Sequence, residues 1–136
     1  MKIAVVTDDE RTISQHFGRA SKYVVYTVED GRMLEHELRD KLGHSQFAKE
    51  EQDRGHQHQD DTRGHGYGRH AEDKHKRMFA NILDCEVVLA RGMGRGAYQG
   101  MLQANLKPIV TDIADMEAAV LAVIDGTIVD HTESLH

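Results

Sequence analysis

Apolar residues along the chain occur in short runs separated by polar turns, and the period of the pattern changes between segments. Nearly continuous apolar runs at 2–7 and 86–90 predict buried strands, because a strand covered on both faces has no polar side. Aromatic and β-branched residues at 23–28 predict another strand. Alternation at 33–39 predicts an antiparallel edge strand, or alternatively a short helix, after an Asp-Gly hairpin turn at 30–31.

The second half of the chain has apolar residues at helical spacing. This spacing predicts three helices, over residues 71–83, 97–105 and 116–124. Asp115 is placed to cap the last helix and Gly126 to end it. A short strand is expected at 108–111, and a short tail at 127–136. Strands that alternate with helices in this way predict an α/β fold.

The composition restricts the class of protein. A length of 136 residues fits one domain, spanning 1–136, with a core of its own. Cys85 is the sole cysteine, so no intramolecular disulfide can form. The chain opens on a strand without a signal-peptide core, and no apolar run approaches the roughly 20 residues that span a bilayer. We therefore expect a cytoplasmic protein with no membrane partner. A net charge of −6 argues against a broad basic face for nucleic acid.

A long polar insertion interrupts the pattern at 43–77, where the sequence has no Ile, Leu, Val or Met. Too little apolar surface is available to offset the entropy of ordering, so we expect most of it, at about 43–70, to be flexible. Six of the ten histidines lie in this stretch, at His44 and at the candidate metal ligands His56, His58, His65, His70 and His75. Imidazole binds Zn, Ni and Cu, and two histidines at i, i+2 can hold one ion from an extended chain. Irregular spacing without paired cysteines argues against a preformed tetrahedral zinc site, and a merely solvated loop is the alternative.

The strand at 86–90 leads through Arg91-Gly92-Met93-Gly94-Arg95-Gly96 into the helix predicted at 97–105. A strand, a glycine turn and a helix direct backbone N–H groups at the helix N-terminus toward an anion or ligand. Glycines are expected here for positive φ and for close approach of a ligand, with a plain tight turn as the alternative. Their GxGxG spacing matches neither a Walker A sequence nor a dinucleotide fingerprint, which argues against ATP and NAD.

Three segments taken together resemble a known family. They are the opening Lys2-Ile3-Ala4-Val5 with Asp8, the loop His16-Phe17-Gly18-Arg19-Ala20, and Asp84-Cys85-Glu86-Val87-Val88 running into Gly92-Met93-Gly94 and Ala97. With these segments the chain resembles the dinitrogenase iron-molybdenum cofactor biosynthesis family, which includes NifX-like and NifB C-terminal-like domains and orange-protein relatives. The resemblance implies a ribonuclease-H-like three-layer fold, with a five-stranded mixed sheet in the order 3-2-1-4-5 and helices on both faces. It also implies a protein that is not an enzyme and that carries or inserts iron–sulfur or molybdenum-containing clusters.

His16 is the central residue of the expected site. It follows the first strand, on the same edge of the sheet as the glycine turn, where a neutral imidazole could ligate a cluster metal. Clusters of this type are anionic, so arginine side chains and backbone N–H groups would hold their sulfurs or oxygens. The expected cofactor-binding residues are His16, Arg19, Arg91, Gly92, Met93, Gly94, Arg95 and Gly96. For the arginines the alternative is solvent-facing charge, and for Met93 it is a packed plug.

The chain is therefore predicted to be a non-enzymatic carrier or scaffold for an iron–sulfur or molybdenum-containing cofactor, with cluster donor and acceptor proteins as partners. A divalent metal-ion binding or sensing module that uses only the histidine-rich insertion is the alternative. A nuclease would need Asp8, Asp9 and Asp112 to gather around two metal ions. Asp8 and Asp9 follow the first strand instead of lying within it, and the acidic chain lacks a basic track, so we do not expect that activity.

Overall fold

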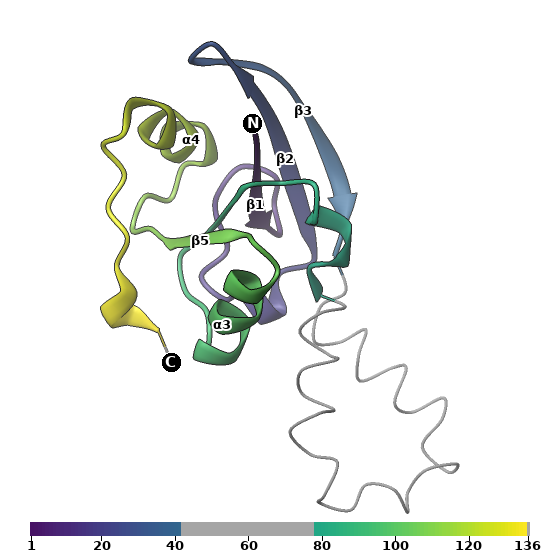
Figure 1. Cartoon of the computed structure of the whole chain (residues 1–136), viewed down its shortest axis with the longest axis vertical. Coiled ribbons are helices and arrows are strands. Elements are labelled where there is room, and N and C mark those ends of the chain that lie inside the picture. Colours follow the sequence, from purple (N-terminus) through teal and green to yellow (C-terminus); the bar gives the residue numbers. More distant parts are fainter. Residues whose placement is uncertain (42–77, 136) are drawn as a thin grey trace, which may run out of the picture.

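The computed structural model describes residues 1–41 and 78–135, and Figure 1 shows their arrangement. The strands are β1 (Lys2–Thr7), β2 (Lys22–Glu29), β3 (Arg32–Asp40), β4 (Val87–Ala90) and β5 (Lys107–Val110). The helices are α3 (Arg95–Gln103) and α4 (Met116–Asp125), with 3-10 turns η1 (Phe17–Arg19), η4 (Ala80–Ile82) and η5 (Thr132–Ser134). None of the helices in these two ranges is long and apolar enough to cross a membrane.

The five strands form one mixed sheet in the order β3-β2-β1-β4-β5. β1 pairs in parallel with β4, and β4 with β5, whereas β2 runs antiparallel to both β1 and β3. β4 is buried throughout and β1 from its second residue onward, as their apolar sequences predict, while β3 is largely exposed. The α/β prediction, the strand order and the edge strand are confirmed. The ribonuclease-H-like comparison stays a prediction.

Local signals set the turns and the cap of α4 as expected. Asp30 and Gly31 both have positive φ, at 52° and 75°, which is the backbone of a type I′ hairpin turn. The side chain of Asp115 accepts a hydrogen bond from the backbone N–H of Ala118 over 2.8 Å at the start of α4. Gly126 ends this helix in the left-handed conformation at φ 76°.

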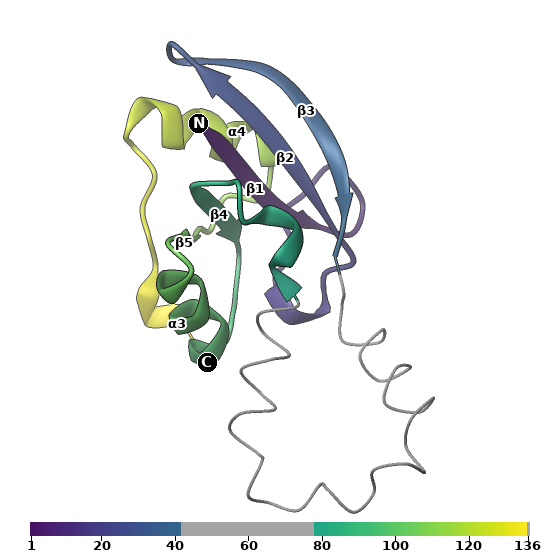
Figure 2. The same ribbon diagram turned by 45° about the vertical axis from the view of Figure 1, so that its right-hand side comes forward.

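Helical segments cover both faces of the sheet (Figure 2). Tyr23 and Tyr26 lie three residues apart on β2, so their side chains point to opposite faces. Tyr26 lies near the carboxylates of Asp115 and Glu117, at the start of α4. The hydroxyl of Tyr23 donates to the backbone carbonyl of Met78, just before η4, over 2.7 Å. α4 therefore packs on one face and the segment around η4 on the other.

The helix predicted over 71–83 meets described structure only from residue 78, and there it is confirmed in part. Residues 71–77 lie outside the described ranges; Met78 is α-helical, and residues 80–82 form the 3-10 turn η4. Asn81 explains the interruption, because its backbone carbonyl accepts from Arg39 and its side-chain amide donates to the carbonyl of Asp40. These bonds tie the chain to β3 and compete with a continuing helix. Ile82 is buried as expected, but Leu83, predicted on the same side, is 58 % exposed.

Two other boundaries differ from the prediction. α3 covers Arg95–Gln103, so it begins two residues before the expected 97 and ends before 105. The segment after α4 was predicted as a tail, but it is bonded to the sheet. His131 donates its backbone N–H to Val110 over 2.7 Å, and a carboxylate oxygen of Asp130 accepts from the N–H of Val110 over 2.9 Å. The C-terminal segment thus covers the outer edge of β5.

Candidate functional site

The carboxyl ends of β1, β4 and β5 meet at one edge of the sheet, where α/β proteins bind ligands. The loop after β1 lies between the loops that follow the other two strands. Phe17 donates its N–H to Gly92 over 2.9 Å, and Arg91 donates to Ser14 over 2.9 Å. On the other side Ile13 donates to Ala114 over 2.8 Å. These bonds fix the backbone around His16 against the glycine turn.

The acids after β1 support this loop. One carboxylate oxygen of Asp9 accepts from the N–H groups of Arg11 and Thr12 over 2.9 and 2.8 Å, which holds the pKa of Asp9 well below its usual range. Asp8 accepts from both the N–H and the hydroxyl of Ser21. In residues 1–41 and 78–135 no three His, Cys, Asp or Glu side chains are grouped as a metal site. The arrangement gives no support to a two-metal nuclease.

His16 borders two neighbouring cavities. The first, about 300 Å³ in volume, is lined by His16, Phe17, Arg19, Met78, Met93 and Gly94 among others. The second, about 420 Å³, is lined by His16, Arg91, Gly92, Thr111, Asp112 and His131 among others. Most of the predicted site residues thus line one of two spaces beside His16, whereas Arg95 and Gly96 line neither. His16, Arg19 and Arg95 are exposed, and Arg91 is half-buried.

The sulfur-bearing residues differ in what they can contribute. Met93 is 1 % exposed and packs in the core while lining the first cavity, as a plug would. Met78, which lines the same cavity, is 8 % exposed. Burial, with a smaller contribution from Asp84, raises the pKa of Cys85 to about 12, so this thiol stays protonated at neutral pH.

The glycine turn does not use left-handed backbone, so that expectation is wrong. Gly94 has φ −80°, and the glycines with positive φ in the described ranges are Gly31 and Gly126. Gly94 instead leaves room, because a Cβ added there meets nothing within 4 Å. It precedes α3, whose first turn holds no acidic residue and no side-chain cap. The N–H groups of that turn are left for water or a ligand.

A buried lysine packs against the loop that contains His16. Lys41 is 1 % exposed, and its Nζ lies 4.5 Å from the ring centroid of Phe17. The same Nζ donates to the backbone carbonyl of Ala20 over 3.2 Å. Burial lowers the pKa of Lys41 to about 8, opposed by the carboxylate of Asp8. The sequence analysis missed this residue, since a lysine after Arg39 and Asp40 gives no signal of burial.

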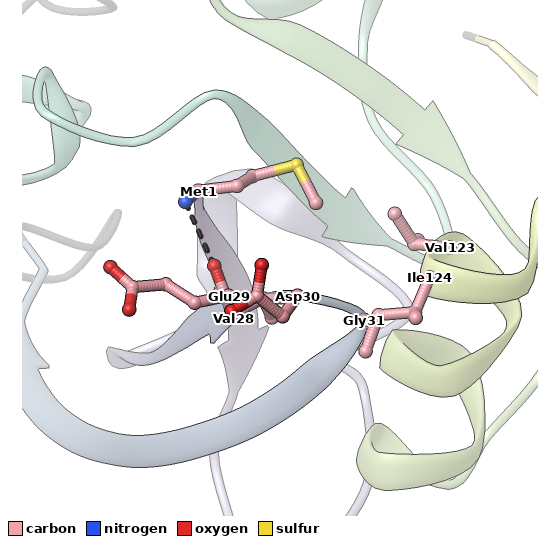
Figure 3. Close-up of a pocket in the computed structure, with 7 residues that line it drawn as sticks. All are labelled: Met1, Val28, Glu29, Asp30, Gly31, Val123 and Ile124. Atoms are coloured by element: carbon pink, nitrogen blue, oxygen red, sulfur yellow. Dashed lines mark hydrogen bonds between the residues drawn. The ribbon is translucent and has the colours of Figure 1, made fainter.

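A further cavity of about 540 Å³ opens at the opposite end of the sheet, where β1 begins (Figure 3). The amino group of Met1 donates to the carbonyl of Val28 over 2.9 Å at its wall. The β2–β3 hairpin and the end of α4 complete the lining. Among the described residues of this wall there is no imidazole or guanidinium. The imidazole of His16 and the guanidinium groups of Arg19 and Arg91 line the two cavities at the other end of the sheet.

Comparison with known families identifies the family of this chain. The family described as dinitrogenase iron-molybdenum cofactor matches residues 1–126. The chain belongs to this family. The match includes His16 and the glycine turn and stops before His131. No curated protein matches the chain in sequence.

Solved structures share the fold at low sequence identity. The apo form of the orange protein from Desulfovibrio gigas has a TM-score of 0.56 and 24 % identity, over 96 % of this chain and 92 % of its own. A Thermotoga protein solved as a candidate NifB protein has a TM-score of 0.58 and 16 % identity, over 96 % and 93 %. The protein PH0822 has a TM-score of 0.62 and 17 % identity, over 98 % and 96 %. These likenesses establish that the three solved structures share the fold of this chain.

The remaining predicted ligands cannot be placed. His56, His58, His65, His70 and His75 lie outside the described residues. His131 was missed in the sequence analysis, because residues after α4 were treated as a tail. Its signal was present locally, since acids stand at Asp130 and Glu133 on either side of it.

Proposed function

We propose that this protein is a non-enzymatic carrier or scaffold for a metal-sulfur cofactor, iron–sulfur or molybdenum-containing. The observation that supports this most directly is the placement of His16. Its ring is exposed between two cavities and has no hydrogen-bond partner in residues 1–41 and 78–135. An imidazole on a fixed backbone, with its side chain exposed, is suited to ligate a metal that arrives and leaves.

The surroundings of His16 favour an anionic cargo over a bare cation. Arg91 lines one cavity and Arg19 the other, and Arg95 stands in the first turn of α3. Guanidinium groups donate strong hydrogen bonds to anionic sulfur or oxygen, and the N-terminal end of a helix adds a partial positive charge. The buried Met93 adds an apolar side chain to the wall of the first cavity. Because apolar side chains exclude water, electrostatic contacts there are stronger.

Membership of the family agrees with this proposal, because the family's description names the iron-molybdenum cofactor. In this proposal the cluster is cargo, received from a donor protein and passed to an acceptor protein in the cytoplasm. Exposure of His16, Arg19 and Arg95 leaves the site open to both partners.

The test is cluster loading of the purified full-length chain under anaerobic conditions, with iron and sulfide supplied and the cluster followed by its visible absorption. We expect the wild-type chain to retain a chromophore through gel filtration and His16→Ala to lose it. His36→Ala is the matched control, since His36 is an exposed histidine on β3, stacked near Tyr26 and away from the site. Full retention by His16→Ala, or no retention by wild type, would contradict the proposal.

Divalent-metal binding by the histidine-rich insertion remains the second candidate, supported by six histidines between 44 and 75. Titration with Zn²⁺ or Ni²⁺ separates the two. If a variant lacking residues 44–70 loses all metal and cluster binding, the insertion is the functional element. If that variant still takes up the chromophore and His16→Ala does not, the carrier proposal holds.

A further inference from the structure

The C-terminal segment places a second histidine at the carboxyl edge of the sheet. The backbone of His131 is fixed by its 2.7 Å bond to the carbonyl of Val110, and the Asp130 carboxylate accepts from the N–H of the same Val110. Val110 is the last residue of β5, so these two bonds hold the segment against the outer edge of the sheet. His131 thereby joins Asp112, in the loop after β5, on the wall of the second cavity.

The ring of His131 is oriented by a carboxylate. Its Nδ1 lies 2.9 Å from Oε2 of Glu133, a hydrogen-bond distance. Because a carboxylate accepts, Nδ1 carries the proton in this bond, and in the neutral ring Nε2 then keeps its lone pair. Metal-ligating histidines have this arrangement, in which the second nitrogen donates to a carboxylate that fixes the tautomer and the ring plane.

The other nitrogen faces a second carboxylate at a distance that suits a shared ion. Nε2 of His131 lies 3.6 Å from Oδ2 of Asp112, which is longer than a hydrogen bond. Two ligands of a tetrahedral ion with bonds near 2.0–2.1 Å stand about 3.4 Å apart. The two atoms are therefore spaced as neighbouring ligands of one cation.

The charge around this pair favours a cation. Asp112, Asp130 and Glu133 contribute three carboxylates near His131, against the single guanidinium of Arg91 in the cavity lining. The side chains of Asp112 and Glu133 are 79 % and 72 % exposed, so water can complete the coordination of an ion. No third protein ligand is in place among the described residues. An imidazole with one carboxylate suits Zn²⁺, Co²⁺ or Ni²⁺ better than Mg²⁺ or Ca²⁺, which prefer oxygen alone.

We propose that Nε2 of His131 and Oδ2 of Asp112, with the His131 ring held by Glu133, form a binding site for a divalent transition-metal ion such as Zn²⁺. The histidine of this site lies beyond residue 126, where the family match ends. The site borders the same cavity as His16 but does not use His16 as a ligand. A plain ion pair of protonated His131 with the two carboxylates is the competing explanation, and the experiment distinguishes them.

The experiment must resolve individual histidines, because the full-length chain has ten. Ring ¹H–¹⁵N correlations of wild-type protein are followed during a Zn²⁺ titration, with His131 assigned through its own backbone, so no variant is needed for the first answer. We expect the Nε2 signal of His131 to move to a metal-bound position while Nδ1 stays protonated. If the His131 ring responds to pH but not to Zn²⁺ up to about 1 mM, His131 forms an ion pair only. A site with a dissociation constant below about 1 mM would respond at that concentration.

Variants then test the assignment of roles. Glu133→Gln should weaken Zn²⁺ binding at His131 by about 10–100-fold, the usual cost of losing an orienting carboxylate. Asp112→Asn should weaken it as well, whereas His36→Gln, far along the sheet on β3, should leave it unchanged. His16→Ala should abolish cluster retention without changing the His131 response. If His16→Ala removes the Zn²⁺ response of His131, the two sites are one and the inference of a separate ion site is wrong.

Discussion

Lys41→Met offers a direct measurement of the charge buried beneath the His16 loop. A fall in the pKa of Lys41 from 10.5 to about 8 corresponds to about 3 kcal/mol for keeping the ammonium charged in the folded protein. A cation–π contact with the ring of Phe17, 4.5 Å from Nζ, offsets up to about 2 kcal/mol of this cost. We therefore expect a net cost of about 1–3 kcal/mol at neutral pH.

The sign of the pH dependence follows from the lowered pKa. Below about pH 8 the lysine is charged in both states, and the folded protein bears the full cost. Between about 8 and 10.5 the folded state gives up the proton before the unfolded state does, so the cost fades as pH rises. The stability of Lys41→Met relative to wild type should thus fall by about 1–3 kcal/mol from pH 7 to 10.5.

Urea unfolding followed by circular dichroism, at pH values from about 7 to 10, measures this difference. Cys85, whose pKa burial also shifts, is present in both proteins and cancels in the comparison. Lys107→Met is the matched control, because Lys107 is exposed at the start of β5. A difference between Lys41→Met and wild type that is the same at every pH would refute the reasoning.

Four further changes test the loops and caps. Asp115→Ala should lower the free energy of unfolding by about 1 kcal/mol, because Ala118 loses its capping acceptor; urea unfolding measures it. The melting temperature of Asp9→Asn should fall less steeply below about pH 4 than that of wild type. The wild-type carboxylate contributes stability above its unfolded pKa, and this stability disappears as pH falls. Equal falls in melting temperature in the two proteins would contradict this. Gly94→Ala should fold like wild type, since its Cβ meets nothing within 4 Å, yet retain less cluster in the loading assay. Gly31→Ala, at φ +75°, should instead lose about 1 kcal/mol of stability.

Features that depend on neighbours in the sequence could be predicted. The continuous apolar runs of β1 and β4 identify buried parallel strands, because few other environments hide both faces of a strand. The Asp30-Gly31 turn and the caps of α4 are set by the conformational preferences of one or two residues. His16 could be selected because parallel strands place their following loops at one edge.

Features that depend on contacts between distant parts of the chain could not be predicted. The burial of Lys41 requires the rings of Phe17 and Tyr23, which the fold brings to it from across two strands. The pairing of His131 with Asp112 depends on the path of the C-terminal segment along β5. The helix expected to continue to residue 83 changes after Met78 into the 3-10 turn η4, where Asn81 bonds to β3, and this tertiary contact overrides helical periodicity.

Hydrogen bonds join the described residues on either side of segment 42–77, and they form a junction beside the first cavity that His16 lines. Asp40 accepts from the side chain of Asn81 over 2.8 Å, and the hydroxyl of Tyr23 holds the carbonyl of Met78, which lines that cavity. Exchanging the segment for another of a quarter its length would change the closure free energy by only about 1 kcal/mol, because this term grows with the logarithm of length. The junction is thus a point at which evolution or an engineer can exchange the segment attached beside the His16 cavity while the sheet stays intact.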